Sequence, residues 1–191
     1  MSGGRLLALV LVAGLVFGAA VAVVKGQETG ARDALGNMSA PWVVVPFLAG
    51  TRYPRAWQAM LVGIAATLAA FFGFYLAEAA ILDLGSHPWY TDIRLTLRSG
   101  TIYEVWGVPT GALYGVLGWL WASRRLVLAP VAVGLAFACE PLIVLTLARA
   151  GVWGGGGLLD RPWLWLPEVL IGLGCIAFAV TKAQAPPTRT S

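Results

Sequence analysis

The sequence predicts an all-α integral membrane protein built as a bundle of six transmembrane helices, and three observations support this prediction. Of the 191 residues, 59% are hydrophobic and only 12% are charged, whereas a soluble domain carries about a quarter charged residues. The mean hydropathy is +0.78, and the apolar residues fall into runs long enough to cross a bilayer. None of these runs alternates polar and apolar residues as the strands of a membrane barrel do, so helices are predicted.

The first apolar run covers residues 6–24 and is bounded by Arg5 and Lys25. At about 1.5 Å per residue it extends over nearly 30 Å, the thickness of the hydrocarbon core. A signal peptide is the alternative interpretation, because Arg5 precedes the run and the segment 20–22 (A-V-A) resembles a cleavage site. The length of the run and the spans that follow favour a retained helix.

The second predicted span, residues 35–51, is the shortest and carries Pro41 and Pro46. As a helix it would cover about 25 Å, which is marginal for a crossing. A re-entrant or interfacial segment is the alternative. The choice matters because it sets the side of the membrane on which every later loop lies.

The other four predicted spans are longer and end at charged or polar segments; they comprise residues 56–82, 105–122, 126–147 and 163–180. Between the third and the fourth, the polar stretch 83–101 contains I-R-L-T-L-R, an alternation typical of a segment on the membrane surface. The tail 183–191 is predicted to be disordered. Residues 1–182 therefore form one transmembrane domain.

The basic residues give little bias for orientation. With six spans and a cytoplasmic N-terminus, seven Lys and Arg residues lie inside and six outside, and the rule counts these residues rather than net charge. The acidic residues then lie outside or within the spans. A five-span arrangement with an outer N-terminus, with eight inside and five outside, is the alternative. We predict a multi-pass protein of the bacterial inner (plasma) membrane with both termini in the cytoplasm.

A short pattern of tryptophan followed by proline opens three of the runs, about sixty residues apart. Its three copies are Trp42 to Pro46, Trp106 to Pro109 and Trp163 to Pro167. The pattern indicates three helical hairpins, an arrangement found among transporters. Coincidence is the alternative, because tryptophan is common at membrane interfaces and proline at first helical turns.

Two glutamates in the last two spans are the first candidates for a functional site. Glu140 lies in the middle of the fifth run, before Pro141, and Glu168 follows Pro167. An ionisable group at membrane depth costs several kcal/mol unless it is paired or hydrated. Both lie about 20 Å from the cytoplasmic ends of their helices, so they can meet at one level. Two carboxylates in an apolar medium require a proton, a cation or an arginine between them.

Two further acids and a tyrosine lie nearer the outer face. Glu78 and Glu104 lie close to this face, and Tyr75 is one turn below Glu78. With the two deeper glutamates they predict an outward-opening polar cavity that binds a small cation, a proton or an amine-bearing solute. The alternative is structural: each acid caps a helix, or pairs with Arg149 or Arg161 during folding.

Small residues at helical spacing predict close helix packing at Gly14 and Gly18 and at Gly111 and Gly115. Such faces usually pack within a multi-span protein. They also support a second functional hypothesis, a non-catalytic membrane component that assembles with a membrane protein partner.

Several function classes are excluded by what the sequence lacks. Its basic residues form no cluster suited to nucleic acid. Cys139 and Cys175 lie in apolar runs and His87 stands alone, so no metal site or cofactor is predicted. No motif of a hydrolase or protease occurs, and we predict that the protein is not an enzyme. An intramembrane enzyme that uses a pair of acids is the alternative with the least support.

Two segments resemble a family of small actinobacterial multi-span membrane proteins of unknown function. They are residues 34–50 (A-L-G-N-M-S-A-P-W-V-V-V-P-F-L-A-G) and residues 73–78 (G-F-Y-L-A-E). Together they cover about a quarter of the chain in apolar residues of low specificity. The resemblance implies a multi-span membrane fold and assigns no activity or functional residue.

Overall fold

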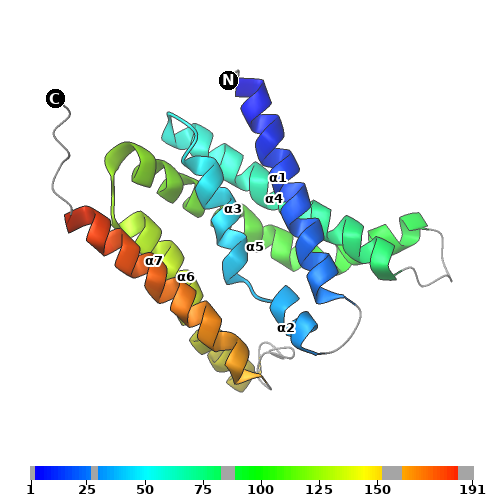
Figure 1. Cartoon of the computed structure of the whole chain (residues 1–191). Helices are drawn as coiled ribbons and strands as arrows, with labels where there is room; N and C mark the ends of the chain where they lie inside the picture. The colour runs from blue at the N-terminus through cyan, green and yellow to red at the C-terminus, as the bar shows by residue number, and fades with distance from the viewer. Residues whose placement is uncertain (1–2, 27–29, 83–88, 152–160, 185–191) are drawn as a thin grey trace.

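The computed structural model describes residues 3–26, 30–82, 89–151 and 161–184. In these residues it contains helices and no strand, which confirms the predicted all-α class. The elements, in chain order (Figure 1), are α1 (Gly3–Lys25), α2 (Ala31–Gly36), α3 (Ala40–Gly50), α4 (Ala56–Leu82), α5 (Trp89–Arg124), α6 (Leu128–Arg149), the 3₁₀ turn η2 (Pro162–Leu164) and α7 (Trp165–Gln184).

Four helices of the described chain are long and apolar enough to cross a membrane. They are Gly3–Lys25, Ala56–Ile81, Leu128–Arg149 and Pro162–Lys182. Large apolar side chains stay exposed on them, including Val16 on α1, Leu142 on α6 and Leu170 on α7. Exposed apolar faces of this extent are unfavourable in water and suit lipid, so the fold is compatible with a membrane location.

The second predicted span, 35–51, is not one continuous helix. The structure has α2 and α3 in its place, separated by residues 37–39. The Asn37 side chain ends α2 by donating hydrogen bonds from Nδ2 to the backbone oxygen and to Oδ1 of Asp33. With 11 residues, α3 is only about 16 Å long. It packs against α4, α5 and α6 inside the bundle (Figure 1).

The fourth predicted span, 105–122, is the C-terminal part of a much longer helix. The backbone of α5 is helical over 36 residues from Trp89, so the part of the predicted surface stretch 83–101 that the structure describes belongs to α5. This helix runs beside α4, and the two approach closely where glycines face each other. A Cβ atom at Gly115 would lie only 2.3 Å from the backbone oxygen of Ala59.

The last hairpin, α6 and α7, packs through Gly134 and Gly172 and joins the bundle at α3 (Figure 1). A cluster of buried apolar residues forms the junction: Ala40, Val43, Phe47, Ala129, Val133 and Phe137. The predicted tail, 183–191, begins two residues too early, because α7 continues to Gln184; residues 185–191 lie outside the described part of the chain.

One end of the bundle is basic. The α3–α4 loop reaches the end of α5, where Trp119 Nε1 donates to the backbone oxygen of Pro54 at 3.0 Å. The ammonium of Lys182 lies 5.7 Å from the ring centroid of Trp121. The basic side chains that these contacts bring to the same end are Arg52, Arg55, Arg124, Arg125 and Lys182.

Candidate functional site

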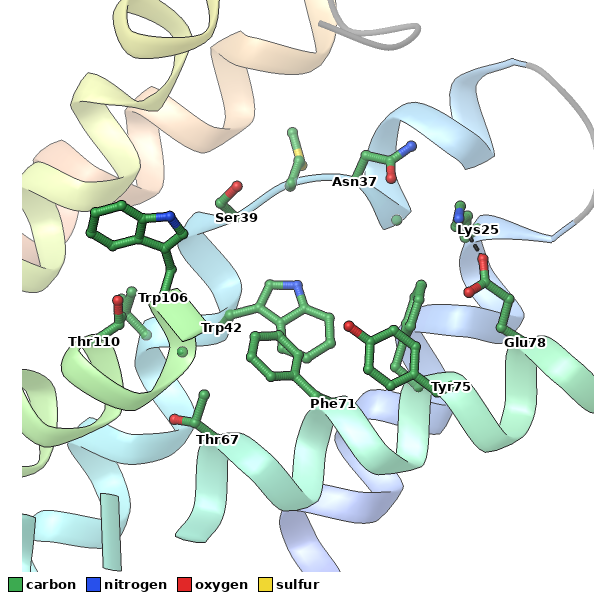
Figure 2. A pocket seen from close by; sticks show the side chains of 15 residues that line it. Lys25, Asn37, Ser39, Trp42, Thr67, Phe71, Tyr75, Glu78, Trp106 and Thr110 are labelled. Carbon is green, nitrogen blue, oxygen red and sulfur yellow. Dashed lines mark hydrogen bonds and ion pairs between the residues drawn. The ribbon is translucent and has the colours of Figure 1, made fainter. Parts of the chain in front are cut away.

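A cavity of about 490 Å³ lies at the opposite end of the bundle, where α1 ends and α3 begins. Its walls come from α1, the α2–α3 junction, α3, α4 and α5. Figure 2 shows Lys25 and Glu78 at one end of the cavity, Thr67, Thr110 and Trp106 at the other, and aromatic rings between them. Asn37 and Ser39 lie along one side. The cavity is therefore apolar in its middle and polar at its ends.

The aromatic wall follows from helical spacing on α4 and from one residue of α3. Phe71, Phe74 and Tyr75 are three and four residues apart, so they project from one face of α4. Trp42 projects from α3 onto this face, with ring centroids 4.8 Å from Phe71 and 5.7 Å from Phe74. The ring of Tyr75 is stacked near Phe71 at 6.4 Å. These rings present both faces and edges to an occupant.

An ammonium group already occupies the charged end of the cavity. Lys25, the last residue of α1, places its Nζ atom 2.6 Å from Oε1 of Glu78 and 5.3 Å from the ring centroid of Phe74. Both side chains of the ion pair are partly exposed, at 23% and 19%. The end of α1 is fixed by Arg32, which donates hydrogen bonds to the backbone oxygens of Val23 and Val24.

Glu140 lies behind this cavity and caps α3. Its Oε1 accepts the N–H of Ser39 and its Oε2 accepts the N–H of Ala40, both at 2.5 Å. The first N–H groups of a helix have no partner within the helix, and a carboxylate there also complements the helix dipole. Glu140 is only 5% exposed. The structure thus gives it the capping role that was the structural alternative.

Glu168, on the neighbouring helix α7, is 4% exposed. Its carboxyl group and that of Glu140 interact across the α6–α7 hairpin, as expected for two acids at one level on adjacent helices. The Oε1 atom of Glu168 is buried and has no hydrogen-bond partner among the described residues.

The remaining candidates separate into two groups. Tyr75 and Glu78 line the cavity, whereas the side chain of Glu104 lies outside the described residues. The four glycines lie at contacts within the chain: Gly14 and Gly18 pack against α4, and Gly111 and Gly115 against Gly63. No group of three or more His, Cys, Asp or Glu side chains gathers in the described part of the chain.

Several lining residues were not singled out from the sequence: Lys25, Asn37, Phe71, Phe74 and Thr110. Trp42 and Trp106 were noted only as members of the tryptophan–proline pattern. The spacing of aromatic residues on α4 was a usable signal. The contribution of Lys25 could not be predicted from the sequence, because its pairing with Glu78 depends on how α1 packs along α4.

The fold and cavity together define an all-helical protein in which four helices of the described residues are long and apolar enough to cross a membrane, with an aromatic-walled site. The chain belongs to a family of unknown function (DUF6518), whose model matches residues 2–185. The unknown-function part of the resemblance is thereby confirmed. No curated protein and no solved structure matches the chain.

Proposed function

We propose that this protein is a multi-span membrane protein that binds a small amine-bearing solute in the aromatic cavity, with Glu78 as the group that holds the ammonium. One observation carries the proposal: the ammonium of Lys25 lies between the Glu78 carboxylate and the Phe74 ring. A carboxylate and an aromatic face are the two groups that proteins use to bind organic cations. The ammonium of Lys25 therefore makes the two contacts that the ammonium of a bound solute would make.

The remainder of the cavity supports a solute with an apolar body. Between its polar ends the lining is mainly the rings of Trp42, Phe71 and Tyr75. Binding sites for small molecules commonly combine such apolar walls with a few placed polar groups. A volume of about 490 Å³ lies in the range of these sites.

Glu78, rather than Glu140, is the proposed anchor because its carboxylate is accessible. Both oxygens of Glu140 are engaged by the N–H groups of Ser39 and Ala40. Glu78 binds one flexible ammonium at a partly exposed position. Ion pairs of this kind contribute only about 0–1 kcal/mol, so a solute can displace Lys25 at little cost.

Benzyltrimethylammonium is a suitable probe, because it carries a fixed positive charge beside an aromatic ring. We expect it to change the tryptophan fluorescence of the purified protein and to raise its melting temperature. The variant Glu78→Gln should weaken binding about tenfold or more, the equivalent of 1.4 kcal/mol. The variant Lys25→Gln removes the competing ammonium and should strengthen binding.

Phenylacetate serves as the anionic control and should not bind. Preferential binding of phenylacetate, with loss on Lys25→Gln, would make Lys25 the anchor and overturn the proposal. Equal affinity of wild type and Glu78→Gln for the ammonium probe would also overturn it.

We further propose that the basic end of the bundle faces the cytoplasm, so that the cavity lies in the outer half of the membrane. Five basic side chains gather at that end, and Lys and Arg are enriched in cytoplasmic loops. Arg5 lies at the same end, because α1 runs parallel to α4, with Gly14 against Ala66 and Gly18 against Ala70. This arrangement retains the predicted cytoplasmic position of both termini.

Cysteine labelling tests the orientation. In a background with Cys139 and Cys175 replaced by serine, Ala150→Cys at the cavity end should react with a membrane-impermeant maleimide on intact bacterial cells whose outer layers the reagent can cross. Ser123→Cys, at the basic end, should react only after the membrane is permeabilised. Both positions are exposed. The reverse labelling pattern would contradict the proposed orientation.

A further inference from the structure

The contact between Glu140 and Glu168 lies outside the proposed solute site. It brings together two buried carboxyl groups that cannot both be ionised without a compensating group. Both side chains are at least nine-tenths buried, and their carboxyl groups interact. Two ionised carboxylates are acceptors only and have no hydrogen to share. In a low-dielectric interior their repulsion would also be large. Their contact therefore requires a group that supplies positive charge or a hydrogen.

The geometry assigns the negative charge to Glu140. Its two oxygens accept the N–H groups of Ser39 and Ala40 at the start of α3, and hydrogen bonds from backbone N–H groups favour the ionised form of a carboxyl group. The ionised form of Glu168 is not stabilised in this way, since its Oε1 has no hydrogen-bond partner among the described residues.

We propose that Glu140 and Glu168 form a proton-binding pair, in which Glu168 carries one proton and donates its O–H to the Glu140 carboxylate. A metal ion is a poorer occupant, because no third His, Cys, Asp or Glu side chain of the described residues joins the two acids. When the proton leaves, the O–H bond of Glu168 breaks, its electrons stay on the oxygen, and water accepts the proton. Two adjacent carboxylates then remain.

The charged groups on the surrounding elements do not replace this proton in the described geometry. Lys25 pairs with Glu78 on the far side of the cavity, and Arg32 on α2 donates to backbone oxygens of α1. Asp33 on α2 accepts from Asn37. The first residues of α3 and the described side chains of α5 between Val105 and Ser123 carry no charge. Arg149, at the end of α6, is exposed to the surroundings and lies nine residues beyond Glu140. Arg161, next to η2, is the other basic group at this end, and the infrared test covers neutralisation of the pair by Arg161.

Loss of the proton should act on the cavity through α3. The pair holds Ser39 and Ala40, and Ser39 and Trp42 both line the cavity. Repulsion between two carboxylates favours separation of α7 from α6 or of Glu140 from α3. Either movement loosens the start of the helix that carries Trp42. This last step concerns the proposed solute site, whereas the proton-binding pair itself does not depend on what the cavity binds.

Infrared spectroscopy of the protein in lipid nanodiscs tests the pair directly. At neutral pH, wild type should show the carbonyl stretch of one buried protonated carboxyl group. The band should be lost in Glu168→Gln, whose amide still donates a hydrogen bond to Glu140, and retained in Glu78→Gln. If wild type shows no such band, the pair is ionised or neutralised by Arg161, and the proposal is overturned. A band that persists in Glu168→Gln also overturns it.

A pH titration of wild type tests the coupling and does not require any variant to fold. As the pH rises and the band disappears, the melting temperature should fall in the same pH range. The affinity for benzyltrimethylammonium, whose charge does not titrate, should weaken about fivefold or more, as for typical coupling between sites. A melting temperature that stays constant while the band disappears would overturn the coupling. Failure of the amine to bind at any pH, with the band present, would overturn the solute site alone.

Discussion

Replacing Glu140 with alanine is expected to lower the free energy of unfolding by about 3–5 kcal/mol. The variant removes the acceptor of two buried N–H groups, those of Ser39 and Ala40. Hydrogen bonds to a charged group contribute about 1.5–3 kcal/mol each, and buried donors left without a partner carry the full desolvation penalty. Reversible unfolding in mixed micelles, monitored by circular dichroism, measures the change.

Two control variants isolate the capping contribution. Glu140→Gln keeps one acceptor oxygen and should lose less stability than Glu140→Ala. Glu78→Gln breaks a partly exposed ion pair and should cost less than about 1 kcal/mol. If Glu140→Ala unfolds at the same denaturant concentration as Glu78→Gln, the capping contacts do not stabilise α3 to the stated extent.

Substituting valine for Gly18 is expected to lower the free energy of unfolding by about 3 kcal/mol or more. A Cβ atom at Gly18 would lie 1.7 Å from the backbone oxygen of Ala70, a separation that no rotamer change relieves. α1 would have to move away from α4, and the apolar contacts between these two helices would be lost. The same change would separate Lys25 from Glu78. The unfolding assay described for Glu140 measures the loss of stability.

Gly174 provides the matched control. It lies within α7, and a Cβ atom there would have no neighbour within 4 Å. Gly174→Val should therefore cost much less stability than Gly18→Val. Comparable destabilisation by the two substitutions would show that backbone contact between α1 and α4 is not the reason for glycine at position 18.

The class of the fold could be predicted because hydrophobicity and length are local properties. Runs of apolar residues around 6–24, 56–82, 126–147 and 163–180 correspond to α1, α4, α6 and α7, which in the described part of the chain are long and apolar enough to span a membrane. The number of six spans and the bacterial inner-membrane location remain predictions, as does assembly with a membrane protein partner.

The segment 35–51 shows where local reasoning failed. Its apolar composition suggested one span, but Asn37 bonds back to Asp33 and ends α2, and the N–H groups at the start of α3 receive their acceptor from α6. A partner 101 residues away cannot be inferred from the residues around Ser39. The short helix is stable in the interior because α4, α5 and α6 surround it.

The candidate site could be predicted only in part. Glu78 and Tyr75 were identified from the sequence because an acid close to a membrane interface, with a tyrosine one helical turn away, is recognisable from residue type and spacing alone. The ion pair with Lys25 and the position of Trp42 over α4 required two helix contacts, α1 with α4 and α3 with α4, that the sequence did not specify.

The sequence alone determined that this chain is helical, that its helices carry apolar faces suited to lipid, and that the acids within its apolar runs require partners. These properties depend on residue type and spacing along one helix. Only the tertiary structure decided which partner each acid has: Lys25 for Glu78, and the start of α3 together with Glu168 for Glu140. Hydrogen bonds and ion pairs act over a few ångströms, so they are fixed by which helices pack together and at what height.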